Sequence, residues 1–299
     1  MQFQTIGLVG YGEVGKIFSA GLKTKNGVHS MGAWDLKFER ASSQVAEHAH
    51  AAQAGVVAHS SCRALCEASD MVISAVTASN TLAVATEVSK YIRPGSLFLD
   101  LNSASPGTKQ RCAALIESQG AHYVEAGVMT SVPPYGVRTP MLLGGAKAAE
   151  LALILNSWGM DAKAVSEKLG VASAIKMCRS VMIKGLEALV IESYTTARAY
   201  GVEDHVLPTL AETFPSIDWE QTGAYFFSRV AKHGQRRAEE MCESAITVSE
   251  AGFEPYMASA IAGKQQWVAD QSKAGVFDGL DNDARWQDYA DKLLKNRPL

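Results

Sequence analysis

The chain has 299 residues, 47% of them apolar and 20% charged, which is the composition of a globular protein with one or two domains. Its net charge of −3 supplies no general basic field, so we expect no nucleic-acid partner. No apolar run reaches the roughly 20 residues that span a bilayer. The first residues also lack the pattern of a secretory signal, so we expect a cytoplasmic protein without a membrane segment.

The first half of the chain alternates short apolar runs with helical patterns. The run at 71–76, bounded by Asp70 and Thr77, is typical of a buried parallel strand. Ser105 followed by Pro106 indicates a helix N-terminus. We expect strands at 5–9, 30–35, 71–76, 97–101, 122–129 and 141–143, a short apolar segment at 56–59, and helices at 13–23, 40–54, 60–68, 82–91 and 106–118. This alternation predicts a doubly wound parallel sheet.

The second half of the chain reads as helices only, because strand signals stop at about residue 166. Residues 172–200 contain no proline and predict one helix about 40 Å long, with Gly201 as its stop. Further helical patterns cover 226–250, 255–273 and 283–294. We expect a dinucleotide-binding domain over 1–166 and an all-helical substrate and dimerisation domain over 167–299, joined by the long helix, with the active site in the cleft between them. A long exposed helix commonly needs a partner surface, which predicts a homodimer.

A glycine-rich motif follows the first expected strand. Its residues are Gly10, Tyr11, Gly12, Glu13, Val14 and Gly15, which fit the G-x-G-x-x-G pattern between a strand and a helix. In that pattern the first glycine allows a tight turn, the second lets the backbone approach a pyrophosphate, and the third lets the helix pack against the strand. The helix N-terminus offers free N–H groups to the phosphates. The motif predicts a Rossmann-type domain that binds a dinucleotide.

Asp35, at the end of the second expected strand, bears on the choice of cofactor. A carboxylate there accepts hydrogen bonds from the ribose hydroxyls of NAD and repels the 2′-phosphate of NADP. Lys37 and Arg40 lie close by in the sequence, and either of them can hold such a phosphate. We therefore expect NAD, with NADP left open.

The long helix carries polar residues on one face. Lys176, Ser180, Lys184 and Glu187 fall within about 80° of one another around a helix. One interpretation is a solvated stripe on a surface helix. The small residues before Lys176 favour another, in which a cofactor or substrate comes close to the helix start. A desolvated lysine near another cation has a lowered pKa and can act as a base near neutral pH. We therefore expect Lys176 to take the hydroxyl proton while hydride leaves for the nicotinamide.

These residues resemble the β-hydroxyacid dehydrogenase family, which is related to 6-phosphogluconate dehydrogenase. The resemblance covers nearly the whole chain and rests on the segments 10–15, 100–106, 125–131 and 176–180. The stretch 176–185 looks most like a branch whose C-terminal domain has no known function. The resemblance implies that Lys176 is the catalytic acid/base and that the segment 100–106 contacts substrate.

Several positions depart from the family pattern. Asn102 and Ser103 stand where the family usually has serine and threonine, and Ser180 stands where an asparagine usually supports substrate. Ile183 stands where the phosphogluconate enzymes carry a glutamate that acts in decarboxylation, which argues against a true 6-phosphogluconate dehydrogenase. The run 126–131 also differs from the family's alanine-proline-valine-serine-glycine-glycine. The departures leave the substrate unnamed and affect the hydride chemistry less.

The remaining expected site residues surround the reacting group. We expect the nicotinamide near Val76, Thr77 and Asn102, beyond the strand ends. Asn102, Ser103 and Thr130 are expected to orient the substrate, and the resemblance adds Ser180 and Lys184. Arg236 or Arg237 is a hypothetical partner for a substrate carboxylate, the alternative being a charged turn on a surface helix.

Cysteine and histidine spacing predicts no metal site. Cys62 and Cys66 lie four residues apart, but no second Cys or His pair lies near them. The seven histidines show no H-E-x-x-H spacing. The five cysteines are odd in number and scattered, so we expect reduced thiols.

The sequence thus predicts an NAD(P)-dependent dehydrogenase that acts on a CH–OH group of a small hydroxy acid or related polar alcohol. One alternative is an imine reductase, which resembles this family in fold. Such enzymes usually carry an aspartate or tyrosine at the lysine position, so Lys176 counts against this alternative. A second alternative is a redox sensor that binds NAD(H) without turnover. Such a protein would keep the glycine motif and would not need the lysine face.

Overall fold

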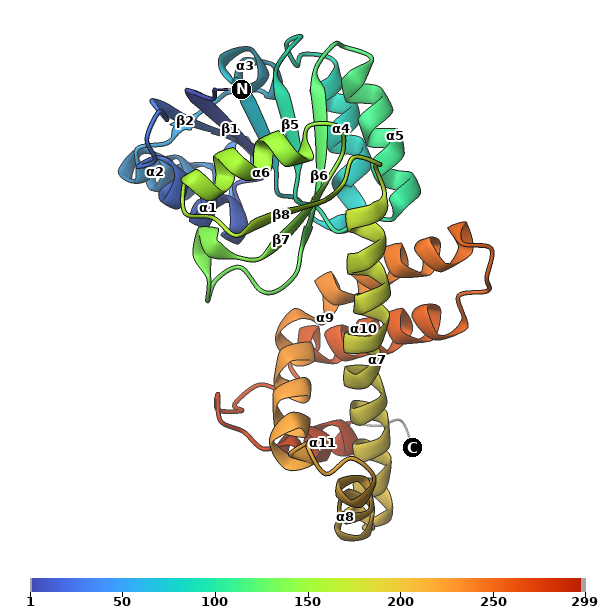
Figure 1. Ribbon diagram of the computed structural model, residues 1–299. Helices are drawn as coiled ribbons and strands as arrows, with labels where there is room; N and C mark the ends of the chain where they lie inside the picture. Colours follow the sequence, from blue (N-terminus) through green and yellow to red (C-terminus); the bar gives the residue numbers. More distant parts are fainter. Residues whose placement is uncertain (1, 297–299) are drawn as a thin grey trace. The chain divides into compact units, whose positions relative to one another are not determined.

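The computed structural model describes residues 2–296. The chain divides into two compact units, a first unit that ends at Met177 and a second unit that begins at Cys178 (Figure 1). The division falls inside one helix, α7 (Val171–Tyr200), so both units share a continuous element. The last strand of the first unit ends at Ser166, where the sequence predicts the domain boundary. That boundary stays a prediction.

The first unit is built on one eight-stranded sheet, whose order is β3-β2-β1-β4-β5-β6-β7-β8 (Figure 1). The strands are β1 (Thr5–Val9), β2 (Ser30–Trp34), β3 (Val57–Ala58), β4 (Met71–Ser74), β5 (Leu97–Asp100), β6 (His122–Val128), β7 (Met141–Gly144) and β8 (Ala162–Ser166). All pairs are parallel except β6 with β7. The strand order reverses between β1 and β4, and in doubly wound sheets ligands bind at the carboxyl ends of the strands at such a point.

Alternate residues of the central strands face two separate hydrophobic cores. Ile73 of β4 packs in one core, and its neighbour Val72 packs in the other. Leu99 and Phe98 of β5 divide in the same way, as the two-residue period of a strand requires. The helices of this unit are α1 (Glu13–Leu22), α2 (Gln44–Ala54), α3 (Cys62–Ala68), α4 (Thr81–Ser89), α5 (Pro106–Glu117) and α6 (Ala148–Ser157), with 3-10 turns η1 (Leu36–Phe38), η2 (Ala78–Asn80) and η3 (Gly136–Arg138). Both faces of the sheet are therefore covered, which confirms the doubly wound α/β class.

The last part of the sheet differs from the sequence-based expectation. β7 runs antiparallel to β6, so the expectation of an entirely parallel sheet is wrong at this edge. The chain returns from β6 to β7 through residues 129–140 without an α-helix that could cross over the sheet, and such a direct return joins antiparallel neighbours. The sequence also does not predict α6 or β8. β8 is an edge strand with Lys163 exposed, so it lacks the apolar run that marks the central strands.

The second unit is all helical, as expected. Besides the later turns of α7 it contains α8 (Glu203–Thr213), α9 (Trp219–Glu250), α10 (Tyr256–Lys273) and α11 (Trp286–Lys295). Tyr194, Phe227 and Trp286 are fully buried in its main core. The sequence does not predict α8, because Pro208 lies inside it and proline normally interrupts a helix. Among residues 2–296, no helix is both long enough and apolar enough to cross a membrane.

Candidate functional site

The glycine motif forms the turn between β1 and α1. Gly10 has a φ of +96°, and a Cβ on it would collide with the Ala75 carbonyl oxygen. A Cβ on Gly15 would collide with the Gly10 carbonyl oxygen, so both positions need glycine for the turn itself. A Cβ on Gly12 would meet no atom within 4 Å. The fold therefore does not explain the glycine at position 12, whereas a pyrophosphate close to the backbone does.

Asp35 lies against the glycine motif, directly after β2. Its carboxylate oxygens accept the backbone N–H of Tyr11 at 2.6 Å and that of Lys37 at 2.9 Å. The Tyr11 ring packs on Phe38, its hydroxyl lies 3.1 Å from His50 Nδ1, and burial raises the pKa of that hydroxyl. The carboxylate keeps further lone pairs, so it fits the ribose hydroxyls of a dinucleotide. The sequence-based placement of Asp35 next to the motif is thus supported by its contacts.

Asn102 links the carboxyl ends of β4 and β5, next to the point where the strand order reverses. Its Oδ1 accepts the Val76 N–H at 2.7 Å, and its Nδ2 donates to Ser74 Oγ at 2.8 Å. The side chain is almost completely buried, and its backbone N–H donates to Asp100. Asn102 therefore fixes the loop that carries Val76 and Thr77, where the sequence predicts the nicotinamide. The sequence does not predict this bracing role.

A buried ion pair lies beneath that loop. Asp100 accepts from Lys109 Nζ at 2.9 Å and from the Tyr123 hydroxyl at 2.6 Å, and both side chains of the ion pair are fully buried. Burial raises the pKa of Tyr123 well above its usual value, and the negative charge of Asp100 adds to that effect. The Lys109 ammonium also donates to the Asp100 carbonyl oxygen at 3.1 Å. This network anchors the segment from which Asn102 and Ser103 project.

Lys176 and Ser103 meet within the first unit. The Lys176 Nζ donates to Ser103 Oγ at 2.6 Å, and both side chains are partly exposed. Gly127 of β6 allows the helix to come close, since a Cβ there would lie 2.9 Å from the Ala172 carbonyl oxygen. Thr130, the other expected substrate contact in this unit, is exposed two residues beyond the end of β6. The structure thus brings the predicted base together with one of its predicted substrate-orienting neighbours.

Glu125 of β6 is a buried carboxylate at the start of α7. One of its oxygens accepts the N–H of Gly170 at 2.7 Å and of Ala172 at 3.2 Å, and the other accepts the N–H of Ser173 at 3.3 Å. The sequence alone predicts no role for this residue. The signal that was available is a carboxylate inside an otherwise apolar strand, because such a charge is buried only with partners.

The second unit holds the rest of the polar face of α7. Ser180, Lys184 and Glu187 are each at least 95% buried, so the interpretation as a solvated stripe is wrong for these three. Lys184 Nζ donates to Ser180 Oγ at 3.2 Å and pairs with Glu240 of α9 at 2.8 Å. Burial lowers the pKa of Lys184, and the charge of Glu240 opposes that shift. These contacts stabilise the packing of α9 on α7 within the second unit.

Arg236 and Arg237, which follow each other on α9, have different surroundings. Arg237 is buried and forms a bidentate pair with Glu187, which also accepts a hydrogen bond from Gln265 at 3.3 Å. Arg236 is half exposed and pairs with Glu240 at 3.0 Å. Both guanidinium groups thus hold carboxylates of the chain itself. The role in binding a substrate carboxylate stays a prediction.

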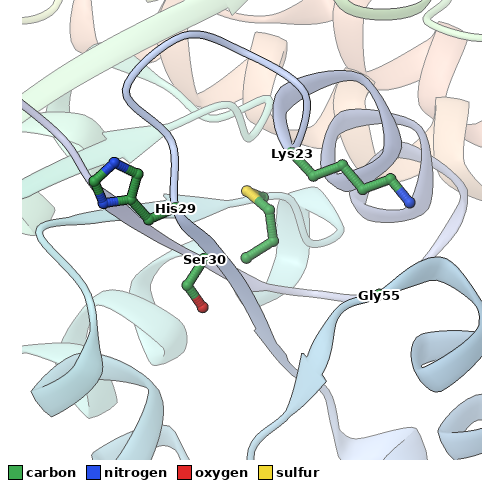
Figure 2. A pocket seen from close by; sticks show the side chains of 5 residues that line it. Lys23, His29, Ser30 and Gly55 are labelled. Atoms are coloured by element: carbon green, nitrogen blue, oxygen red, sulfur yellow. The ribbon is translucent and has the colours of Figure 1, made fainter.

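Two cavities lie away from these residues. One has a volume of about 220 Å³ and is lined by Lys23, His29, Ser30, Met31 and Gly55 (Figure 2). Ser30 is the first residue of β2, so this cavity lies at the amino end of the sheet, opposite the glycine motif. The other, of about 420 Å³, lies in the second unit beside α7. Neither cavity includes a predicted site residue, and residues 2–296 contain no cluster of metal-ligating side chains.

Comparison with known proteins identifies the first unit. Residues 5–165 match the family described as the NAD binding domain of 6-phosphogluconate dehydrogenase. The chain belongs to this family. Residues 197–268 match a domain of unknown function, DUF1932. A conserved hypothetical protein from Sinorhizobium meliloti 1021 is 36% identical, with a TM-score of 0.76 over 98% of this chain and 96% of that one.

Two more distant structures share the fold. A 3-hydroxyisobutyrate dehydrogenase from Mycobacterium tuberculosis, solved with L-serine, is 18% identical, with a TM-score of 0.66 over 98% of this chain and 99% of that one. An imine reductase from Myxococcus stipitatus, in complex with NADP+, is 19% identical, with a TM-score of 0.53 over 97% and 99%. At this level of identity the likeness extends to the fold. The family match and this likeness together confirm the membership of an NAD(P)-binding family and the resemblance in fold to hydroxyacid dehydrogenases.

Proposed function

We propose that this chain is an NAD(P)-dependent dehydrogenase that oxidises the CH–OH group of a small hydroxy acid or related polar alcohol. The observation that carries the proposal is the 2.6 Å contact between Lys176 Nζ and Ser103 Oγ. In this contact the basic nitrogen of Lys176 on α7 meets the hydroxyl of Ser103, which lies on the loop after the carboxyl end of β5. In dinucleotide-binding folds, ligands bind outside the carboxyl ends of the parallel strands.

The glycine motif and Asp35 would hold the cofactor. The space left open at Gly12 would accommodate a pyrophosphate, the N-terminus of α1 would supply N–H groups to it, and Asp35 would accept from ribose hydroxyls. The loop braced by Asn102, with Val76 and Thr77, would border the nicotinamide. When bound, the nicotinamide supplies the acceptor for hydride from the substrate carbon.

Lys176 would carry out the proton chemistry. In its neutral form the amine accepts the proton of the substrate hydroxyl, so that a carbonyl forms as hydride leaves the carbon. In the reverse direction the ammonium returns that proton to the oxygen. Ser103, already within hydrogen-bond distance of Lys176, would accept from or donate to the same substrate oxygen. General acid/base groups of this kind typically contribute about 10²–10⁴-fold to a rate.

We further propose NAD as the preferred cofactor. The support is Asp35, whose negative charge lies beside the glycine motif through the Tyr11 N–H and would repel a 2′-phosphate. NADP is the alternative cofactor because of Lys37. The backbone N–H of Lys37 donates to Asp35, so its side chain begins beside the place where a 2′-phosphate would bind.

We propose that the protein is a cytoplasmic homodimer. Large apolar side chains of α7 are exposed, with Met182 at 66% and Leu189 at 54%. A group of large apolar side chains on an exposed face is typical of a protein–protein contact surface. Cys62, Cys66 and Cys112 are buried and unbridged, which is typical of a reducing compartment. Sedimentation of the protein as a monomer at micromolar concentration would contradict the dimer.

The decisive experiment follows cofactor reduction by absorbance for the wild type and for Lys176→Ala. NAD and NADP are supplied separately against 3-hydroxy acids, aldonic acids and polar aryl alcohols. We expect activity on one class and a loss of at least about 10²-fold in the variant. Unchanged activity in Lys176→Ala would move the base to another residue. Activity only in the reduction of imines would favour the imine reductase alternative, and cofactor binding without turnover would favour the redox sensor.

A further inference from the structure

The feature that carries a further inference is the hydrogen bonding of Glu125 to the N-terminus of α7. Glu125 is fully buried in β6, and its two oxygens accept three backbone N–H groups, those of Gly170, Ala172 and Ser173. The first N–H groups of any helix lack partners inside the helix. Here a strand of the sheet supplies those partners through one side chain.

The backbone around Glu125 is shaped for this contact. A Cβ on Gly144, the partner of Glu125 in the β6–β7 pair, would lie 2.5 Å from Glu125 Oε1. Gly170, whose N–H makes the shortest of the three bonds, has a φ of +98° and turns the chain into the helix. Both glycines are therefore required by the position of the carboxylate and of the N–H groups that it accepts. The contact is a built feature of the first unit.

The contact is one helical turn from Lys176. Ala172, whose N–H is bound by Glu125, and Lys176 are four residues apart and lie on the same face of α7. Lys176 projects from the turn that follows, so a shift or fraying of the first turn would displace its side chain. Lys176 reaches Ser103 at 2.6 Å, a distance that a displacement of even 1 Å would break.

The charge of Glu125 matters as well as its shape. The N-terminus of a helix carries a partial positive charge, which disfavours a cation within the first turns. A carboxylate at that terminus offsets the partial charge and favours the protonated form of a nearby lysine. Removing the charge while keeping the shape should therefore extend the activity of the base to lower pH.

We propose that Glu125 is a positioning residue, which holds the first turn of α7 on β6 and so sets the distance and protonation of Lys176 relative to Ser103. This inference rests on the proposed acid/base role of Lys176. Glu125 itself touches no reacting atom. Its bonds to backbone N–H groups distinguish it from the substrate-orienting residues, which act through their own side chains.

The test compares Glu125→Gln with Glu125→Asp. In Glu125→Gln, an NH₂ group replaces one of the two accepting oxygens. This NH₂ donates and cannot accept, so at least one of the three hydrogen bonds from backbone N–H groups is lost. We expect kcat to fall about tenfold or more, with KM within about threefold, and the acidic limb of the kcat/KM profile to move to lower pH. Glu125→Asp keeps the charge and should restore the wild-type pH profile, with kcat between the two.

Ser61→Ala is the matched control. Ser61 caps α3 in the same unit by accepting the Ala64 N–H at 3.1 Å, so its removal also costs one helix cap. This control should lower the melting temperature without moving the pH profile. A Glu125→Gln variant that behaves like Ser61→Ala, with wild-type kcat and pH profile, would overturn the proposal.

A second measurement does not depend on turnover. The rate at which an amine reagent such as acetic anhydride labels Lys176, followed by mass spectrometry against pH, reports its protonation and exposure directly. Hydrogen exchange at residues 172 and 173 reports the first turn of the helix. We expect faster exchange and an altered labelling profile in Glu125→Gln. If both are unchanged the proposal fails, whatever the activity. If both change but Lys176→Ala remains active, Glu125 positions Lys176 and the acid/base assignment alone is wrong.

Discussion

Asp100 and Lys109 form an ion pair in which both side chains are fully buried, with 2.9 Å between Nζ and Oδ1. Removing one partner leaves an uncompensated charge in the core, which costs about 3–5 kcal/mol. We expect Lys109→Met to lose about that much free energy of unfolding in urea titrations. The double variant Lys109→Met with Asp100→Asn should be more stable than the sum of the single changes predicts. Additive losses would mean that the two charges do not interact.

Gly12 offers a test of cofactor binding that leaves the fold intact. Because a Cβ there would meet no atom within 4 Å, Gly12→Ala should unfold at the wild-type temperature. The added methyl group would occupy the space required by the pyrophosphate. We expect NAD affinity, measured by calorimetry, to fall at least about tenfold, which is about 1.4 kcal/mol. Gly10→Ala is the contrasting variant, since its φ of +96° predicts a loss of stability instead. Unchanged affinity in Gly12→Ala would place the pyrophosphate elsewhere.

Asp35 should determine the preference between the two cofactors. Asp35→Ser removes the negative charge beside the glycine motif, and we expect the ratio of kcat/KM for NADP over NAD to rise about tenfold or more. Lys37→Ala is the companion variant. If the wild type prefers NADP and Lys37→Ala loses that preference, then Lys37 holds the 2′-phosphate and the proposal of NAD is wrong.

Arg236 and Arg237 should respond to substitution in different ways. Arg237→Ala removes the bidentate partner of the buried Glu187 and leaves it with Arg229 at 3.7 Å and the Gln265 amide, so we expect a loss of about 3–5 kcal/mol in stability. Arg236 is half exposed, so Arg236→Ala should change stability by about 0.5 kcal/mol or less. If Arg236 binds a substrate carboxylate, the KM of the Arg236→Ala variant should rise. Unchanged KM in both variants, measured on folded protein, would remove the arginines from the site.

Asp70 should give the fold a dependence on acidic pH. Burial acts to raise the pKa of Asp70, but hydrogen bonds from the Thr5 hydroxyl and from the Gln4 and Thr5 N–H groups, with Arg93, outweigh it and lower the pKa. A carboxyl whose pKa is lower in the folded state stabilises the protein above its unfolded value of about 3.9, and this contribution is lost as pH falls through the folded value. Asp70→Asn should flatten that part of the stability curve below about pH 4. Parallel curves for both proteins would contradict this assignment.

The sequence predicts the parts of the fold that local patterns specify. The buried run at 71–76 and the proline after Ser105 mark β4 and α5 to within two residues. β8 escapes prediction because an edge strand with an exposed Lys163 carries no continuous apolar run. The sequence does not predict α8 because Pro208, which lies inside it, normally indicates the end of a helix.

The residues of the candidate site also fall into those that local sequence patterns predict and those that such patterns do not predict. The glycine motif, Asp35 and Lys176 are visible in the sequence because each has a residue type and a spacing tied to its chemistry. Glu125 and Asp100 are not, because their roles depend on partners that only the folded chain brings together. The Gly170 N–H, for example, lies 45 residues from Glu125 in the sequence. A charged residue within an apolar strand indicates such a partner, because a charge is buried only when it is paired or hydrogen-bonded.

The two ends of the sheet limit how copies of this chain can associate. β3 has only two residues, and β8 presents an exposed lysine beside half-buried positions. Neither edge offers the long, flat, apolar strand that recruits another strand by backbone pairing. The sheet is therefore protected against growing into a neighbour and against the aggregation that such growth begins. Ordered self-association would have to proceed through helical faces.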